Sequence, residues 1–402
     1  MKLEGLRVID LSQFLPGPHF TMMMADHGAE VIRVESRAGE PTRVIGARQA
    51  NASVWFRNTH RGKKSVVLDL KRAEGVAAFI KLAASADVVV EAFRPGVVDR
   101  LGIGYQAVRA VHPGIVYVSI AAFGQSGPLS QRPAHDLSIQ AESGVLSLNC
   151  GSDGKPALPG VPAADMVSSL MAMNGVMMAL LRRQQTGLGD YIDISMQDSL
   201  LSWLVNVVGP VFGEERDLVL ANERGFGGNA FYKLYECADG RFISLGGSEV
   251  KFAANLLKAL GRPELIDLCR QPPGPAQAPV RAFLQETFAS QPLPHWEAFL
   301  QPLDVCWAPV RSIKEALETA QVHERGMRQE VTQSGFGGGK VTQLGIPIRY
   351  QDEPGRINPE IPELGEHTHE VLGSLGMASE DIALASGLAP GQTLTAQAQA
   401  HG

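Results

Sequence analysis

This chain of 402 residues has few cysteines and a small net charge. Its four cysteines form no CxxC pair and show no disulfide or zinc-site spacing, which is typical of reduced, buried thiols in a cytosol-like compartment. Only 19% of the residues are charged, and the net charge is −6. This mild acidity argues against a non-specific nucleic-acid binder, so we expect no nucleic-acid partner.

Long apolar runs are missing as well. The best membrane candidate, residues 166–181, is uncharged but short, and it contains two serines and an asparagine. This composition predicts a buried helix and not a membrane span. The N-terminal segment has the pattern of a strand and not of a leader. We therefore expect a cytoplasmic protein with no membrane partner.

The turn after the first predicted strand lacks the glycines of a dinucleotide site. It carries one glycine, Gly17, where the GxGxxG motif has three, and those glycines let a pyrophosphate approach the backbone. Without these glycines the pyrophosphate of NAD could not approach the backbone, so we expect no NAD and no permanently bound cofactor. We also expect no metal, because His367 and His369 form a pair without an evident third ligand.

What the chain does contain is an alternation of strand and helix patterns. Continuous apolar strands separated by helices are typical of a parallel sheet covered on both faces, so we predict an α/β doubly wound domain. A long apolar helix over 163–185 and a strand over 190–196 follow it. The Val- and Ile-rich runs predicted as strands before that helix are 6–11, 30–34, 65–70, 87–93 and 115–123.

The pattern changes in the middle of the chain. Residues 230–235 and 241–245 predict a hairpin across an Asp-Gly turn, and helical patterns dominate from 249 to about 317. We expect a small domain over 225–318. The large domain would then be discontinuous, built from residues 1–215 and 325–402.

Two residues are candidates for chemistry. His135 ends a Gly- and Pro-rich loop after the strand over 115–123, where open α/β sheets bind ligands. Histidine titrates near neutral pH and can act as acid or base, while the adjacent Asp136 is well placed to cap a helix. Asp165 lies in the first turn of the long apolar helix, so the helix dipole favours its charge. The apolar residues after it predict a dry pocket, where a carboxylate can attack a thioester or accept a proton.

Cations gather around the strand predicted over 65–70. In an acidic protein such a cluster indicates either a solvated charged face or a site for a phosphate-rich ligand. Arg94 and Arg100 follow the strand over 87–93, and we expect them at the same edge of the sheet. The cations of the cluster are Arg57, His60, Arg61, Lys63, Lys64, Lys71 and Arg72.

Four segments together resemble one known family over about residues 3–375: GLRVIDLSQFLPGPHFTMMMADHGAEVIRVE, THRGKKSVVLDLK, ADVVVEAFRPGVVDRLGIGY and FGQSGPLSQRPAHD. On these residues the chain is identified as a member of the family III CoA-transferases, the CaiB/BaiF group, which includes the α-methylacyl-CoA racemases. The resemblance implies a Rossmann-like large domain with a smaller α+β domain, in an interlocked homodimer. It also implies a coenzyme A thioester as substrate, bound without metal or nicotinamide. The cations that would meet its phosphates are Arg61, Lys64, Arg94 and Arg100.

The resemblance leaves two reactions open. In a transferase, Asp165 would attack an acyl-CoA donor, and an aspartyl-CoA thioester would pass CoA to a small free carboxylic acid. In a racemase, Asp165 and His135 would flank the α-carbon of the substrate, with Glu249 assisting the histidine. The segments MVSSLMAMNG and YIDISMQDSLLSW are closer to transferase sequences. We therefore expect a CoA-transferase, with a racemase as the alternative. The intact Asp165 argues against a third class, a protein that binds CoA without catalytic activity.

Overall fold

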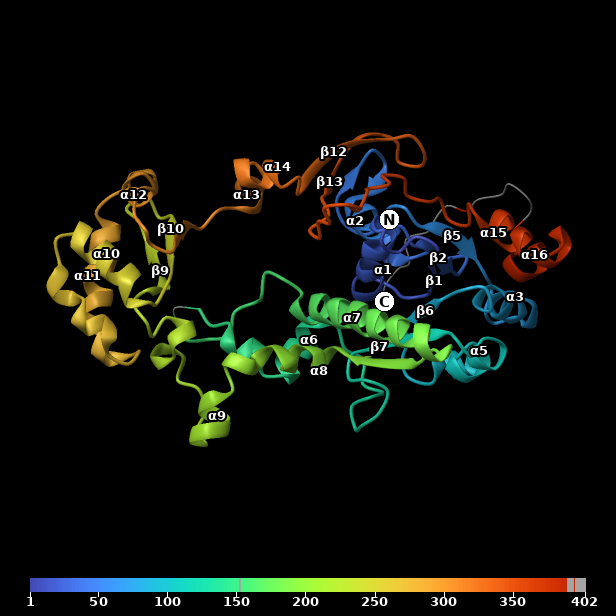
Figure 1. Ribbon diagram of the computed structural model, residues 1–402, viewed down its shortest axis with the longest axis horizontal. Helices are drawn as coiled ribbons and strands as arrows, with labels where there is room; N and C mark the ends of the chain where they lie inside the picture. Colours follow the sequence, from blue (N-terminus) through green and yellow to red (C-terminus); the bar gives the residue numbers. More distant parts are fainter. Residues whose placement is uncertain (152, 389–393, 395–402) are drawn as a thin grey trace. The chain divides into compact units, whose positions relative to one another are not determined.

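The structure is a computed structural model that describes residues 1–151, 153–388 and 394, and it divides into two compact units. Unit 1 comprises Met1–Trp203 and Ala320–Gly402, and unit 2 comprises Leu204–Thr319. The chain can be followed by colour from one unit to the other and back (Figure 1). Residues 204–215, which the sequence assigned to the large domain, group with unit 2.

Unit 1 is built on a six-stranded sheet in which every neighbouring pair is parallel. The strand order is β5-β2-β1-β6-β7-β8, so the chain runs outward from β1 on one side and from β6 on the other. The parallel α/β sheet predicted from the sequence is confirmed. The strands are β1 (Arg7–Asp10), β2 (Glu30–Glu35), β5 (Lys64–Val67), β6 (Val88–Glu91), β7 (Val116–Ala121) and β8 (Tyr191–Ser195).

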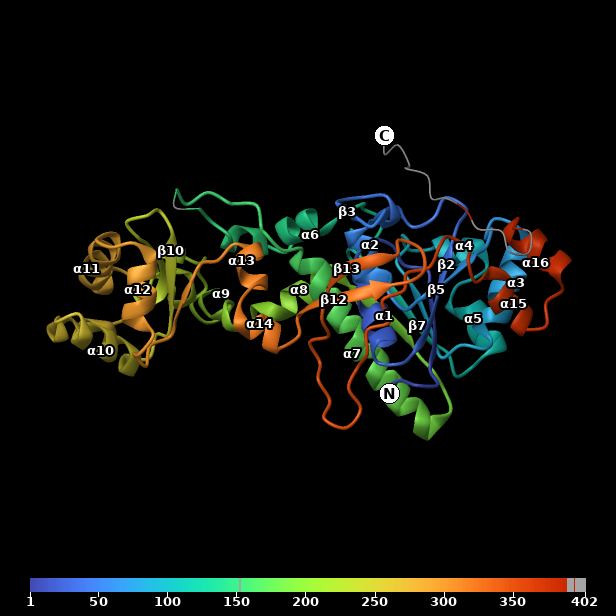
Figure 2. The same ribbon diagram turned by 90° about the horizontal axis from the view of Figure 1, so that it is seen from above.

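Helices cover both faces of this sheet, because successive side chains of a strand point to opposite sides. Val8 of β1 packs in the core formed with α1 (Pro16–Asp26) and α7 (Ala163–Thr186). The next residue, Ile9, packs in the core on the other face. Figures 1 and 2 both show the two groups of helices on opposite sides. The helices on the second face include α3 (Ala73–Ala83), α5 (Tyr105–Val111), α15 (Thr368–Ser374) and α16 (Ser379–Ser386).

Shorter elements complete unit 1. The β12–β13 hairpin contributes residues from the last part of the chain, and α2 contacts β13. These elements are β3 (Arg48–Gln49), β4 (Ala52–Ser53), α2 (Val54–His60), α4 (Val97–Leu101), α6 (Asp136–Glu142), α8 (Met196–Leu201), α14 (Ala320–Glu324), β12 (Arg328–Gln333) and β13 (Gly339–Leu344).

The long apolar helix α7 is buried on one side only. Among the described residues it is the one helix that is long and apolar enough to cross a membrane, because an 18-residue window of it has a mean hydropathy of 1.4. Core helices of soluble proteins also pass this test. Its inner side packs on the sheet and on α1, where His19 Nδ1 lies 2.8 Å from Ser169 Oγ. Its outer side exposes Met178 and Leu181. The sequence predicted a buried helix, and the structure corrects this to a half-buried one.

Unit 2 pairs a small antiparallel sheet with helices. The predicted hairpin is confirmed as β9 (Tyr232–Glu236) and β10 (Phe242–Gly246), with Gly240 in the left-handed region at the turn. A third strand, β11 (Trp307–Pro309), pairs with β10 and lies within the segment predicted as helical. The helices of the unit are α9 (Gly209–Glu214), α10 (Val250–Ala259), α11 (Ala278–Ala289), α12 (Leu293–Leu300) and α13 (Ile313–Leu317).

Candidate active site

A pocket of about 540 Å³ opens beyond the carboxyl ends of β1, β6 and β7 in unit 1. The strand order reverses between β1 and β6, and open α/β sheets bind their ligands at such a point. The pocket therefore has the position of an active site. Its lining is mixed, with apolar side chains beside a few charged ones. The residues that matter for chemistry and shape are Gln13, Phe14, Phe93, Arg94, Arg132, His135, Asp165 and Met196.

Asp165 lines this pocket from the first turn of α7. Among the described residues, no hydrogen bond or ion pair reaches its carboxylate; its backbone groups alone are bonded. Burial, together with the nearby Asp136 carboxylate, raises the pKa of Asp165 to about 7. The sequence predicted a carboxylate at a dry pocket, and this environment agrees with that prediction. A carboxylate without a partner has its lone pairs available to a substrate.

Asp136 holds the end of the helix that carries Asp165. One of its carboxylate oxygens accepts hydrogen bonds from the N–H groups of Ala164, at 2.8 Å, and of Asp165, at 3.2 Å. The other oxygen accepts from Gln140 Nε2 at 2.7 Å. Asp136 thus caps α7 from another element, because the first N–H groups of a helix have no partner within it. It fixes the position of Asp165 and also raises its pKa.

His135 lies at the start of α6 and lines the same pocket as Asp165. Its ring meets the ring of Phe14 edge to face, with 5.8 Å between the centroids. Phe14 follows β1 and has a φ of 63°, in the left-handed region that residues other than glycine rarely adopt. The sequence brought forward His135 but gave no sign of Phe14 as its neighbour, since 121 positions separate the two.

A second pocket of about 460 Å³ lies along the same edge of the sheet. It shares Gln13 and Phe93 with the Asp165 pocket, so the two pockets adjoin. Lys71, from the predicted basic cluster, lines it, and so does Arg37, which the sequence analysis missed. Arg94 lines the Asp165 pocket, and Arg100 lies exposed on α4 and lines neither pocket. Cations from three segments therefore line two adjoining pockets at the carboxyl ends of the strands.

Arg61 and Lys64 lie elsewhere. Arg61 is buried, and it donates two hydrogen bonds to the Asp26 carboxylate, at 2.7 and 3.0 Å. Lys64 begins β5 and pairs with Glu30 and Glu370. The two ends of a strand lie on opposite sides of its sheet, so the cations before β5 are separated in space from those after it. The basic cluster of the sequence is thus divided between the amino and the carboxyl ends of the strands. Arg61 and Lys64 both pair with carboxylates.

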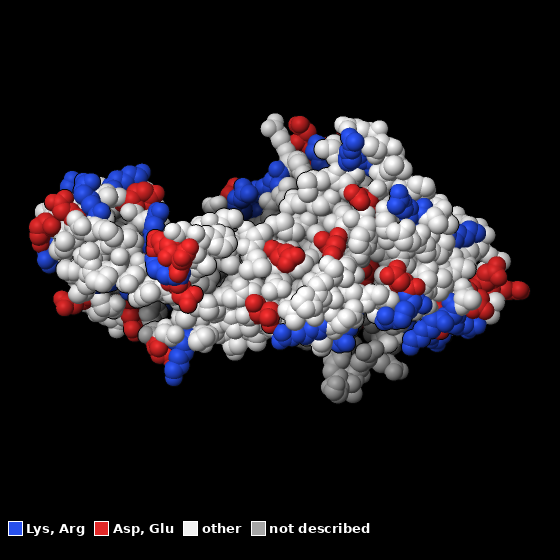
Figure 3. Space-filling view, turned by 90° about the horizontal axis from the view of Figure 1, so that it is seen from below, with Lys and Arg blue, Asp and Glu red and all other residues white. Residues whose placement is uncertain are grey.

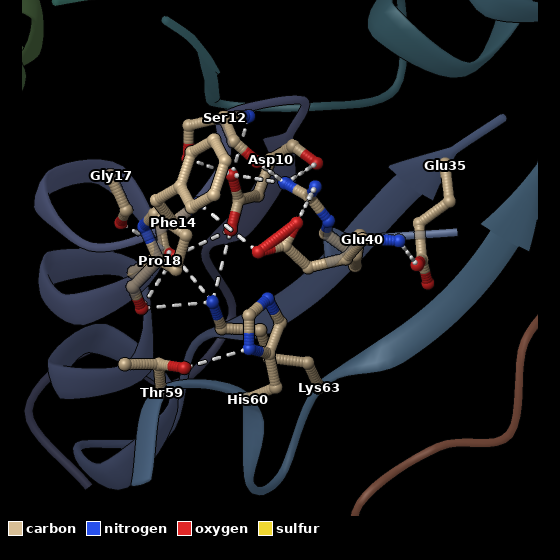
Figure 4. Close-up of polar contacts among 12 residues, drawn as sticks. Asp10, Ser12, Phe14, Gly17, Pro18, Glu35, Glu40, Thr59, His60 and Lys63 are labelled. Atoms are coloured by element: carbon tan, nitrogen blue, oxygen red, sulfur yellow. Dashed lines mark hydrogen bonds and ion pairs between the residues drawn. The ribbon is translucent and has the colours of Figure 1, made fainter. Parts of the chain in front are cut away.

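A buried network of charges lies at the ends of β1 and β2. Lys63 Nζ donates to Asp10 Oδ2 at 3.0 Å, and Arg33 Nη1 donates to Asp10 Oδ1 at 3.2 Å. Arg33 also pairs with Glu40 at 3.5 Å. Figure 4 shows Asp10, Glu40 and Lys63 pointing toward one another. Burial alone would raise the pKa of Asp10, but the Lys63 and Arg33 cations outweigh it and hold this pKa well below its usual range.

Glu249 belongs to unit 2, where it precedes α10 with an exposed side chain, and its assistance to His135 stays a prediction. As for metals, a group of three or more His, Cys, Asp or Glu side chains that could hold an ion does not occur within the described part of the chain.

Comparison with known proteins gives matches along nearly the whole chain. Mouse succinyl-CoA:glutarate CoA-transferase is 32% identical over 378 residues, covering 92% of this chain and 85% of the relative. Mouse alpha-methylacyl-CoA racemase is 32% identical over 388 residues, covering 95% of both chains. The crystal structure of a CAIB/BAIF family protein from Brucella suis superposes with a TM-score of 0.79 at 28% identity, covering 93% of this chain and 99% of that one.

The similarity to transferases and to a racemase agrees with a pocket that holds both an unpaired aspartate and a histidine. The family model described as CoA-transferase family III matches residues 3–368, which include β1, the Asp165 helix and all of unit 2. This protein is therefore an enzyme that belongs to CoA-transferase family III.

Proposed function

We propose that this enzyme transfers coenzyme A from an acyl-CoA donor to a free carboxylic acid through a thioester on Asp165. One observation carries the proposal: the Asp165 carboxylate lines a pocket at the switch point of the sheet and has no described partner. Carboxylates in ion pairs are held by their cations, whereas this one is available to a carbonyl carbon. Relatives described as CoA-transferases support the same reaction class.

The chemistry follows from a carboxylate used as nucleophile. An Asp165 oxygen attacks the thioester carbonyl, the C–S bond breaks, and a mixed anhydride and CoA thiolate form. The thiolate then attacks the Asp165 carbonyl, which releases the donor acid and leaves an aspartyl-CoA thioester. The acceptor carboxylate repeats these two steps in reverse and restores the Asp165 carboxylate. Each step exchanges one acyl bond for another, so the thioester energy is retained.

The two adjoining pockets support a position for CoA. We propose that its thioester end lies at Asp165, in the pocket that Arg94 also lines, and that its phosphates lie toward Lys71 and Arg37 in the second pocket. Arg100, exposed on α4 next to Leu101 of the second pocket, stays in this proposal. Arg61 and Lys64 are left out of it, because carboxylates already engage both side chains.

A racemase is the second candidate, because His135 and Asp165 line one pocket. In that reaction one of them would remove the α-proton of a 2-methylacyl-CoA and the other would return a proton from the opposite face. The same two pockets would hold CoA in either reaction. The identity of the reaction therefore depends on whether Asp165 acts as a nucleophile or as a base.

One incubation distinguishes the two reactions. The enzyme is mixed with (R)-2-methylacyl-CoA in deuterated water, with and without a free carboxylic acid. A transferase moves CoA to the added acid and forms a hydroxylamine-sensitive adduct on Asp165, which peptide mass spectrometry locates. Deuteration at the α-carbon without added acid, with loss of configuration, contradicts the transferase proposal. The variant His135→Ala separates them further, because it abolishes racemisation but slows transfer only moderately.

We also propose an interlocked homodimer in the cytoplasm. Exposed apolar side chains on the outer side of α7, including Met178 at 67% and Leu181 at 64% exposure, support a covering surface from a second copy. On the face drawn in Figure 3, charges of both signs are scattered with uncharged stretches between them. Sedimentation of the purified enzyme tests the dimer directly.

A further inference from the structure

We propose that Glu40 is a positioning residue of the active site, which acts by holding Phe14 against His135. Glu40 has no place in the chemistry proposed above and does not line the Asp165 pocket. Its carboxylate is buried, with 1% exposure, at the edge of the network around Asp10. The inference rests on the proposed function only for its kinetic consequences, since the contact itself needs no substrate.

The first step is the bond between Glu40 and the Phe14 backbone. Phe14 N–H donates to Glu40 Oε1 at 3.1 Å, and Phe14 has a φ of 63°. A left-handed conformation is unfavourable for a residue with a Cβ, so it persists only where surrounding contacts enforce it. The hydrogen bond from the Phe14 N–H to the buried Glu40 carboxylate is such a contact, because it ties the strained backbone to a charged acceptor.

The second step is the rigidity of Glu40 itself. Its Oε1 also accepts from Thr42 Oγ1 at 2.9 Å, while its Oε2 lies 3.5 Å from Arg33 Nη2. Its own N–H donates to Glu35 Oε2 at 2.8 Å. Figure 4 shows the Glu40 side chain extending toward Phe14 and Asp10. The carboxylate is fixed from several sides and can impose its geometry on the loop after β1.

The third step joins this loop to the reacting groups. The Phe14 ring lines the Asp165 pocket and meets the His135 ring edge to face. Phe14 does not line the second pocket, where we place the CoA phosphates. A shift of the ring would therefore alter the surroundings of His135 and the acyl group while leaving the phosphate contacts in place. This predicts an effect on kcat and a smaller one on KM.

The test begins without substrate. In protein with ¹³C-labelled histidine, the His135 ring signals are assigned by their loss in His135→Gln. The variant Phe14→Leu removes the neighbouring ring current and shifts them, and Glu40→Ala should shift them in the same direction. Asp26→Asn is the matched control, because it breaks the buried pair with Arg61 without touching Phe14. Its His135 signals should stay at the wild-type position.

Kinetics provide the second readout. Glu40→Ala should lower kcat roughly 10- to 100-fold, as small displacements near reacting groups do, with KM for acyl-CoA within about threefold. Phe14→Gly adopts the left-handed conformation without strain and has no ring, so adding Glu40→Ala to it should cost little more. If Glu40→Ala does not fold, Glu40→Met has a similar volume but no oxygen to accept the Phe14 N–H, and it should shift the His135 signals the same way.

An unmoved His135 signal in a folded Glu40 variant overturns the inference, and so do additive effects in the double variant. Failure of the proposed function would look different: the wild-type enzyme would then form no adduct on Asp165, while the His135 signals would still respond to Glu40→Ala.

Discussion

Asp165 and Asp10 are two carboxylates of unit 1 whose pKa values shift in opposite directions, although burial raises both. Asp10 lies at the end of β1 between Lys63 and Arg33, and those cations hold its pKa well below the usual range. Asp165 has burial and a neighbouring carboxylate but no cation, and its pKa rises to about 7. The presence of a cationic partner, and not burial alone, decides which carboxylate stabilises the fold and which remains available to a substrate.

The largest expected effect is on turnover in Asp165→Asn. The amide cannot attack a thioester, so CoA transfer should fall by on the order of 10⁴-fold or more, and no hydroxylamine-sensitive adduct should form. The free energy of unfolding at pH 7 should stay at or above that of the wild type, because no ion pair is lost. Residual transfer within tenfold of the wild type would contradict a nucleophilic role.

Asp10→Asn should have the opposite profile. Removal of this carboxylate takes the ion-pair partner from the buried Lys63 and leaves Arg33 with Glu40 alone, which should lower the free energy of unfolding by about 3–5 kcal/mol in urea denaturation. Glu74→Gln serves as control in the same unit, since it loses only an exposed contact with Arg72 at 3.5 Å and should change stability by less than about 1 kcal/mol. Equal effects in the two variants would contradict the contrast between buried and exposed pairs.

The pH dependence of stability should differ in sign between the two carboxylates. Asp165 binds a proton more tightly when folded, so it favours the folded state at low pH, and this contribution is lost as pH rises from about 4 to about 7. Asp10 binds its proton less tightly when folded, so its contribution is present above about pH 4 and is lost below it. Urea denaturation of the wild type and of Asp165→Asn across pH 4–8 tests this. The variant should gain stability relative to the wild type as pH rises, and parallel curves would contradict a raised pKa.

The smallest expected effects on stability and on the pH profile of activity are those of Asp136→Asn. The amide oxygen can still accept from the N–H groups of Ala164 and Asp165, so stability should fall by no more than about 1 kcal/mol. The negative charge that raises the pKa of Asp165 is lost, and the acid limb of kcat/KM should move below the wild-type midpoint near pH 7. A midpoint that does not move would mean that burial alone sets this pKa.

Much of the fold could be predicted because its signals are local. Apolar strand runs, the helix that ends at Gly187 and the Asp-Gly hairpin each depend on a few neighbouring residues, and the structure has them at nearly the predicted positions. Asp165 and His135 were selected as candidates by position, at a helix start and after a strand, and both line one pocket. The short strand β11 was missed because three residues carry too little pattern to stand out from helical surroundings.

The basic cluster shows where sequence reasoning fails. Arg61, Lys64 and Lys71 are close in the chain, but β5 separates them, and Arg61 faces Asp26, 35 residues earlier. Nothing in the local pattern distinguishes a cation in a buried ion pair from one that faces a groove. Arg37 was missed for the same reason, since only the neighbouring strand ends give it a place along the cavity.

By itself the sequence determined the parallel α/β sheet and the family, and it singled out Asp165 and His135 as candidates, because each rests on periodicity or on a motif within one segment. Only the tertiary structure decided what each charge does. Asp165 differs from Asp10, and Lys71 from Arg61, through partners supplied by distant segments, and Phe14 reaches His135 through a loop that Glu40 holds. Electrostatic and steric surroundings depend on distance in space, which the order of residues along the chain does not contain.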